Sequence, residues 1–256
     1  MNARKSRILK AAAAASVAAA LGLTAACGGG GGGRGDDDSA KNGKAAERAS
    51  TETAGAADEV KEPVRDPDGP LTEAQLEKAA IRTGDVKGFK IGDSGIGDLQ
   101  GQSVPAAPAA CQPVADMFLS TTDPGSRAAV SRGVGAEDET DASVTTLVLF
   151  SYGSGDADEV LAGLREATDK CTAYEHTGYK YTEVKVLADP GLGDDSVAYR
   201  LVASIEGATV PAAYTVVRDG TTLAVFASMN MLDADKAEVP EKVIEAQLAK
   251  LRKAAG

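Results

Sequence analysis

A long stretch near the N-terminus lacks the side chains that a folded core requires. Residues 28–59 contain no Val, Ile, Leu, Met or aromatic residue, only Gly, Ala, Ser, Thr, charged residues and one Asn. Such a segment cannot bury enough apolar surface to offset the conformational entropy lost on folding. The sequence therefore predicts a disordered tether over residues 27–70. It confines folding to residues 71–256, a length that is enough for one ordinary domain.

The first 26 residues have the layout of a secretory signal peptide. Residues 1–10 carry four basic side chains and no acidic one, and residues 11–26 are uncharged and rich in alanine. The uncharged run is shorter than the roughly 20 apolar residues that a membrane-spanning helix needs. Removing residues 1–26 changes the formal net charge from −11 to −15. This acidity disfavours nucleic acid as a partner, because binding to phosphates depends on Lys and Arg.

The cysteine at the end of this segment indicates more than secretion. The sequence LTAAC at residues 23–27 resembles the lipobox of bacterial lipoproteins, in which the cysteine is acylated and becomes the first mature residue. The usual Leu three places before the cysteine is Thr24 here. The resemblance implies lipidation of Cys27 and attachment to the extracytoplasmic face of the cell membrane, since two or three acyl chains anchor a protein stably. Plain secretion with cleavage near Ala26 is the alternative.

The domain contains two further cysteines, Cys111 and Cys171. Outside the cytoplasm an unpaired thiol is a liability, so we expect these two residues to form a disulfide bond. A metal-binding or nucleophilic role is the alternative. The chain has no CxxC spacing and only one histidine, His176, which argues against that alternative.

The domain is predicted to be α+β, with a mostly antiparallel sheet of about five or six strands and helices packed on one face. Apolar spacing and capping residues predict helices at 72–82, 156–171 and from Pro240 onward, with a short helix at 113–118. Strands are expected at 88–91, 143–152, 182–188 and 196–205, and on both sides of a hairpin turn at 218–221.

Two local patterns make specific predictions. Thr72 and Gln75 have the spacing of a capping box, which places the start of the first helix at Thr72. The dipeptide Asp219-Gly220 is typical of a two-residue hairpin loop, and counting outward from it pairs Val216 with Leu223.

Four segments resemble the PknH-like sensor domains found in lipoproteins and kinase ectodomains of actinobacteria: LTEAQLEKAAIRTGDVKGFKI at 71–91, ACQPVADMF at 110–118, GLGDDSVAYR at 191–200 and YTVVRDGTTLAVFAS at 214–228. The shared motifs are a D-x-x-G-[FY] turn at Asp85, Gly88 and Phe89, and a G-D turn at Gly193-Asp194. The resemblance implies an extracytoplasmic α+β domain with an internal disulfide and a ligand cleft, without known catalysis.

Two features resemble catalytic or metal-binding patterns. GDSG at 92–95 resembles the sequence around a serine nucleophile, but Ser94 would need a histidine base, and His176 follows it and is expected in a surface loop. The carboxylates of Asp233, Asp235 and Glu238 have a spacing that suits Ca²⁺, but the glycine of an EF-type loop is missing. We predict no catalytic residue, no metal ligand and no cofactor.

The resulting prediction is a non-enzymatic binding or sensor domain whose partner is a small molecule or a protein of the cell envelope. The candidate binding residues are tyrosines on or beside strands 181–188 and 197–205, because Tyr offers an apolar body with a polar tip: Tyr174, Tyr179, Tyr181 and Tyr199. The alternative function is a carrier of a lipid or another hydrophobic molecule, which requires more apolar side chains than one core can use.

Overall fold

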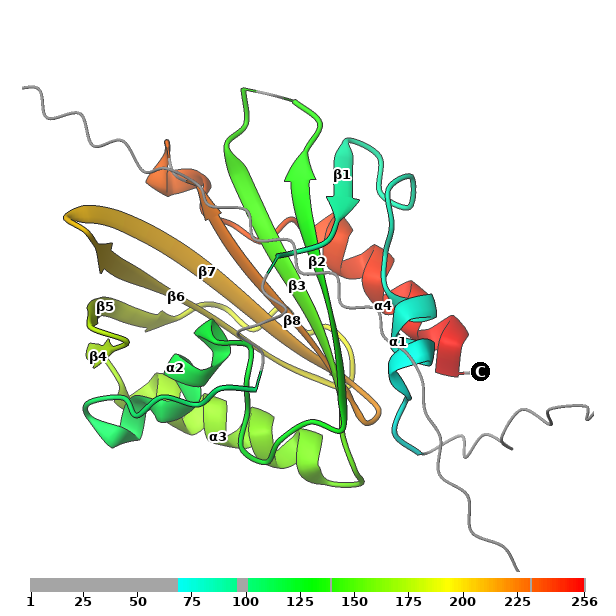
Figure 1. Ribbon diagram of the computed structural model, residues 1–256, viewed down its shortest axis with the longest axis horizontal. Helices are drawn as coiled ribbons and strands as arrows, with labels where there is room; N and C mark the ends of the chain where they lie inside the picture. Colours follow the sequence, from blue (N-terminus) through cyan, green and yellow to red (C-terminus); the bar gives the residue numbers. More distant parts are fainter. Residues whose placement is uncertain (1–68, 96–100, 139, 231, 256) are drawn as a thin grey trace, which may run out of the picture. The chain divides into compact units, whose positions relative to one another are not determined.

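The computed structural model describes residues 69–95, 101–138, 140–230 and 232–255. These residues form an eight-stranded antiparallel sheet with helices on both faces (Figure 1). The strands are β1 (Phe89–Gly92), β2 (Ala128–Ala136), β3 (Ser143–Ser151), β4 (Tyr174–His176), β5 (Tyr179–Val186), β6 (Asp195–Ile205), β7 (Ala208–Asp219) and β8 (Thr222–Asn230). The helices are α1 (Glu73–Ala79), α2 (Gln112–Phe118), α3 (Asp156–Lys170) and α4 (Glu241–Ala255), with 3-10 turns η2 (Ala109–Cys111) and η3 (Ala234–Lys236).

The strand order across the sheet is β1-β2-β3-β8-β7-β6-β5-β4, and each neighbouring pair is antiparallel. The α+β class and the antiparallel sheet are confirmed. The predicted number of five or six strands is wrong, because β2 and β4 were not recognised. In β2 only Val130 and Val134 are larger apolar residues, and β4 has three residues, so neither strand carries a strong β pattern.

The helices cover both faces of the sheet, so the prediction of helices on one face is also wrong. Helices α2 and α3 lie on one face, the α3 face, whereas α1 and α4 lie on the other, the α4 face (Figure 1). Each face has its own hydrophobic core, since alternate residues of a strand point to opposite sides. Phe150 of β3 is buried beneath α3, and its neighbour Leu149 is buried beneath α4. Helical periodicity shows which side of a helix is apolar but not which sheet face it covers.

The two helices on the α4 face are joined by a buried glutamine. Gln247 of α4 is fully buried, and its Nε2 donates to the carbonyl oxygen of Ala79 at 2.9 Å. Its Oε1 accepts from the backbone N–H of Ile81 at 3.0 Å. The C-terminal end of α1 thus depends on α4 for its hydrogen bonds. At the other end of α1 the predicted capping box of Thr72 and Gln75 is confirmed.

The G-D turn that belongs to the sequence resemblance docks on the hairpin between β7 and β8. Gly193 has φ +67°, and the side chain of Asp194 accepts hydrogen bonds from the backbone N–H of Gly220 at 2.8 Å and from Arg218 at 3.3 Å. The backbone N–H of Asp194 donates to the carbonyl oxygen of Arg218 at 2.8 Å. The two motifs therefore act as one structural unit.

The hairpin itself differs in register from the prediction. Its loop consists of Gly220 and Thr221, and Val216 pairs with Val225 instead of Leu223. Gly220 has φ +59°, so the residue that tolerates a left-handed backbone takes the first loop position. A shift of two residues keeps every side chain on its face, and Val216 and Leu223 both remain buried on the α3 face.

The predicted disulfide joins Cys111, at the end of η2, to Cys171, directly after α3. Their Cα atoms are 5.2 Å apart and 60 residues separate them in the chain. Both cysteines are buried in the core of the α3 face. The bond therefore ties the short helix α2 to the far end of α3.

Candidate functional site

The four tyrosines predicted to bind a partner gather on the α3 face. Tyr174 stacks on Tyr181 with ring centroids 4.6 Å apart, and Tyr199 stacks on Tyr214 at 4.8 Å. Tyr174, Tyr181 and Tyr199 are buried, and only Tyr179 is partly exposed. The three buried rings are part of the hydrophobic core, so they offer no surface to a partner in this structure.

Burial of these rings also suppresses their ionisation. Desolvation raises the pKa of the Tyr174 and Tyr199 hydroxyls well above the ordinary range of a phenol. Neither hydroxyl has a hydrogen-bond partner within the described part of the chain. The two groups remain neutral at any physiological pH and carry no acid–base function.

His176 lies in β4 and is buried, so the prediction of a surface-loop histidine is wrong. It contacts Phe118, Tyr174 and Tyr181, with ring centroids 6.3–6.5 Å away. Ser94 follows β1, at the opposite edge of the sheet from β4, and its Oγ donates to Ser131 Oγ at 2.6 Å. The sheet thus separates Ser94 from the only histidine, and the two cannot form a catalytic pair.

We expect the domain to lose stability as the pH falls from about 7.5 to about 5. Burial lowers the pKa of His176 below its ordinary value of 6.5 and outweighs the opposing effects of the Val104 backbone and the Asp116 carboxylate. The unfolded chain then takes up a proton near pH 6.5 that the folded protein binds only at lower pH. The neutral imidazole therefore stabilises the folded state fully above pH 6.5. This contribution to the free energy of unfolding is lost as the pH falls towards the lower pKa of the folded protein.

Thermal unfolding of the full chain at several pH values measures this effect. His176 is the only histidine, so few other groups titrate in this window. The melting temperature of the wild type should fall by a few degrees more than that of His176→Gln. Equal slopes for the two proteins would contradict the assignment.

The carboxylates considered for Ca²⁺ do not converge. Asp233 Oδ1 accepts from the backbone N–H of Asp235, and Asp233 pairs with Lys236. Across the described residues, no group of three or more His, Cys, Asp or Glu side chains is placed to hold a metal ion. In the same part of the chain, no helix has the length and apolar character needed to cross a membrane. Cys27 lies outside the described residues.

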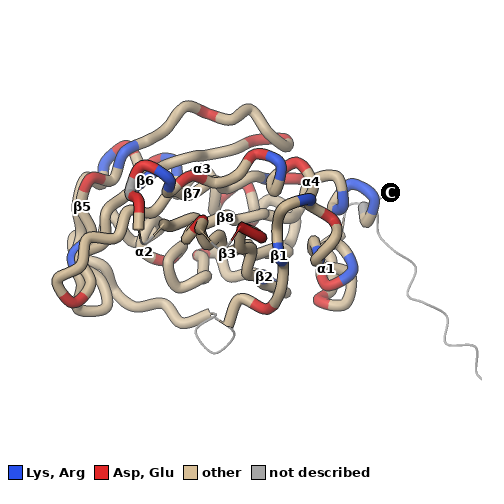
Figure 2. Tube along the Cα trace, turned by 90° about the horizontal axis from the view of Figure 1, so that it is seen from above, with Lys and Arg blue, Asp and Glu red and all other residues tan. Residues whose placement is uncertain are grey.

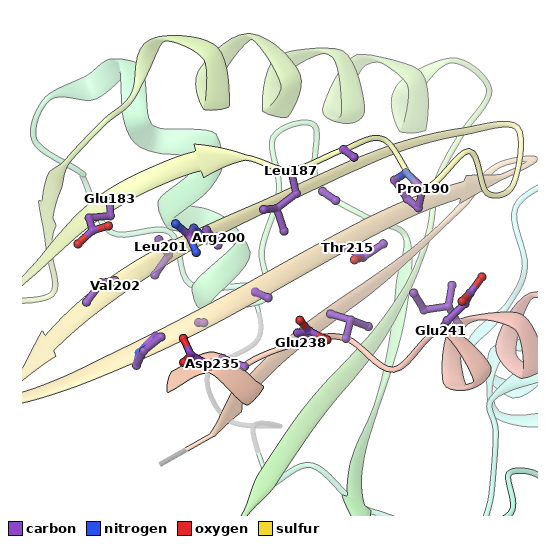
Figure 3. A pocket seen from close by; sticks show the side chains of 18 of the residues that line it. Glu183, Leu187, Pro190, Arg200, Leu201, Val202, Thr215, Asp235, Glu238 and Glu241 are labelled. Carbon is purple, nitrogen blue, oxygen red and sulfur yellow. The ribbon is translucent and has the colours of Figure 1, made fainter. Parts of the chain in front are cut away.

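The structure contains a groove whose position and lining the sequence did not predict. On the α4 face, α1 and α4 pack over strands β1, β2, β3 and β8, and leave β5, β6 and part of β7 without a helix. A groove of about 690 Å³ occupies this half of the face (Figure 3). The segment after β5 forms one wall, and η3 with the start of α4 forms the other. It lies on the strands where binding was expected, but on the face opposite the tyrosines.

The floor of the groove is made of small and apolar side chains that point away from the α3 face. Along β6 and β7 these side chains alternate with residues that are buried in the core of the α3 face. The floor residues are Ala198, Val202, Pro211, Ala213 and Thr215. Leu187, which is 39% exposed, stands on the wall after β5 together with Pro190. A β-bulge between Thr182 and Lys185 shifts the alternation of β5, so that Leu187 reaches this face.

The two sides of the groove differ in charge. Asp235, Glu238 and Glu241 line the wall formed by η3 and α4, and none of them forms an ion pair with another described residue. Arg200 of β6 is exposed beside the floor, also without an ion-pair partner among those residues. Glu183 is paired with Lys185 at 2.9 Å, and this hydrogen bond lowers the pKa of its carboxyl. Elsewhere on the domain acidic and basic residues are interspersed (Figure 2).

Solved structures similar to this chain come from mycobacterial proteins. No protein-family profile and no curated protein matches the sequence. The extracellular domain of PknH from Mycobacterium tuberculosis is 9% identical, with 72% of this chain and 97% of that chain covered and a TM-score of 0.48. A PknH extracellular domain, the type of domain that the sequence motifs resemble, is thus among the solved structures similar to this chain.

Two other solved structures are similar at a lower level. A putative uncharacterized protein from Mycobacterium smegmatis, the Rv0999 ortholog, is 15% identical over 74% of this chain and 99% of that chain, with a TM-score of 0.40. LpqN, involved in cell envelope biogenesis of Mycobacterium tuberculosis, is 17% identical over 45% of this chain and 65% of that chain, with a TM-score of 0.24.

Proposed function

We propose that this protein is a lipid-anchored, non-enzymatic binding protein of the bacterial cell envelope, and that the groove on the α4 face holds its partner. The signal-like segment at 1–26 and the lipobox-like Cys27 support an extracytoplasmic position at the membrane. The Cys111–Cys171 bond supports the same compartment, since structural disulfides persist in oxidising surroundings.

The observation that carries the proposal is the uncovered half of the α4 face. Its floor is apolar, and one wall carries the unpaired carboxylates of Asp235, Glu238 and Glu241. A partner that fits both features has apolar groups facing the floor and positive charge facing that wall. We therefore propose a peptide segment of an envelope protein with alternating apolar and basic side chains.

Two fluorescently labelled octapeptides test this proposal by fluorescence polarisation with the full chain. One alternates leucine and lysine, and the other alternates leucine and glutamate. We expect the leucine–lysine peptide to bind more tightly by at least tenfold. Val202→Arg places a long cation on the floor and should weaken that binding at least tenfold. Ala249→Arg adds the same charge at an exposed position of α4 and serves as the matched control.

A second variant separates charge from shape. Glu238→Gln with Glu241→Gln keeps the volume of the acidic wall but removes two charges, and should abolish the preference for the lysine peptide. Equal binding of both peptides to the wild type, or unchanged binding to Val202→Arg, would overturn the proposal. The carrier alternative predicts a different result: native mass spectrometry of the purified chain would show an apolar molecule that is released on denaturation.

A further inference from the structure

We propose that a second pocket, on the α3 face, binds a saccharide. The pocket has a volume of about 650 Å³ and lies between the C-terminal half of α2, the loop over residues 119–127 and the start of β2. Phe150 of β3 and Ala129 of β2 stand at its base. Because these residues point to the α3 face, the pocket and the groove of the proposed function lie on opposite sides of the sheet.

The lining of the pocket is dominated by hydroxyl groups. Five residues contribute them: Ser103, Ser120, Thr121, Thr122 and Ser126. Two carboxylates, Asp116 and Asp123, one guanidinium, Arg127, and the amide of Gln112 complete the polar set. The formal charge of the lining is therefore −1. Such a set offers both donors and acceptors beside the apolar base, which suits a ligand that is neutral and rich in hydroxyl groups.

A buried carboxylate is held in place at the centre of this set. Asp116 of α2 is only 4% exposed, and its Oδ1 accepts from Ser103 Oγ at 3.0 Å and from Gln112 Nε2 at 2.8 Å. Gln112 is fixed in turn, because its Oε1 accepts from the backbone N–H of Ala106 at 2.7 Å. No described residue donates to the second oxygen of Asp116. This oxygen is positioned to accept a hydrogen bond from a ligand hydroxyl.

Two hydroxyls beside Asp116 also line the pocket. Ser120 is 8% exposed and Thr121 is 9% exposed, and no hydrogen bond joins either hydroxyl to another described residue. Neither oxygen is sealed inside the protein, so a ligand in the pocket can bond to both hydroxyls. Thr122 differs, since its Oγ1 is bonded to the Pro124 carbonyl oxygen and to the Tyr152 hydroxyl.

A saccharide also needs hydrogen-bond donors from the protein, and Arg127 supplies them. Its guanidinium forms no ion pair or hydrogen bond with the described residues. It lies over Gly153, where an added Cβ would come within 2.8 Å of Nη2, so the glycine leaves room for the guanidinium. A sugar hydroxyl both donates and accepts, so a saccharide can bond to the carboxylate of Asp116 and to an N–H donor such as Arg127. The volume matches that of a small-molecule site.

Saturation-transfer NMR with the full chain tests the proposal. The probes are the methyl glycosides of glucose, galactose, mannose and arabinose, together with N-acetylglucosamine, inorganic phosphate and free glycine. We expect at least one sugar to bind with millimolar or better affinity, while phosphate and glycine do not. Asp116→Asn should weaken this binding at least tenfold.

Thr121→Val tests the same pocket in case Asp116→Asn fails to fold. It removes one hydroxyl without changing the side-chain volume. It should weaken sugar binding about threefold or more, whereas Thr182→Val, an exposed control on β5, should leave binding unchanged. The absence of any sugar signal would overturn the proposal. So would sugar binding that persists in both pocket variants, or binding of phosphate or glycine alone.

Discussion

Replacing both Cys111 and Cys171 with alanine should lower the free energy of unfolding by about 4 kcal/mol. The bond closes a loop of 60 residues, and in the chain-entropy model a cross-link of that length restricts the unfolded chain by this amount. In a domain of this size, 1 kcal/mol corresponds to about 2–4 °C, so the melting temperature should fall by roughly 8–16 °C. Thermal unfolding with and without the substitutions measures the loss.

The wild type in the presence of a reductant provides the control for this variant. Reduction removes the cross-link but keeps the two buried sulfur atoms, so it isolates the effect of the bond from that of packing. We expect the reduced wild type to be nearly as destabilised as the double variant. A melting temperature that does not change on reduction would show that the cross-link contributes little to stability.

Gly193→Ala should destabilise the domain by about 2–5 kcal/mol. The residue has φ +67°, a conformation that costs an L-residue about 1–2 kcal/mol. An added Cβ would also lie 2.3 Å from the carbonyl oxygen of Arg218 and 2.5 Å from Cγ1 of Val217. The nearer atom belongs to the backbone of a central strand and cannot move without disturbing the sheet, which adds about 1–3 kcal/mol.

Gly191→Ala is the matched control for this substitution. Gly191 lies two residues away with φ +61°, but an added Cβ there would meet no atom within 4 Å. Gly191→Ala should therefore lower the free energy of unfolding by the cost of the backbone conformation alone, about 1–2 kcal/mol. Urea unfolding of both variants gives the difference. Equal losses would mean that the contact with the β7–β8 hairpin is not what requires glycine at position 193.

The parts of the fold that the sequence predicted correctly have local signals. The capping box at Thr72 and Gln75 involves residues three apart, and the inward face of α3 follows from the spacing of its apolar residues. The Cys111–Cys171 pairing followed from chemistry, because only two cysteines remain after Cys27 is set aside. None of these predictions needed information about distant parts of the chain.

The parts that were missed depend on contacts between distant segments. The strand β2 pairs with β3 over eight residues, yet its sequence AAVSRGVGA has only two larger apolar residues and gives no strand pattern. The groove was missed for a similar reason. It combines Arg200 with Glu238 and Glu241, which are far apart in sequence, and its wall at Leu187 depends on a bulge in β5 that no sequence pattern marks. The predicted binding tyrosines lie on or beside strands that also form the groove, but three of them are buried on the opposite face.

The hydrogen bonds of Gln247 have a consequence for how the chain is made. They join α4 to residues 166 and 168 positions earlier, at the end of α1. During synthesis α1 emerges well before α4, so Leu76 and Ile81 lack their covering helix until residues 241–255 have been made. A chain truncated before Glu241 would leave the first helix without a partner. The α4 face therefore forms only after residues 241–255 have left the ribosome.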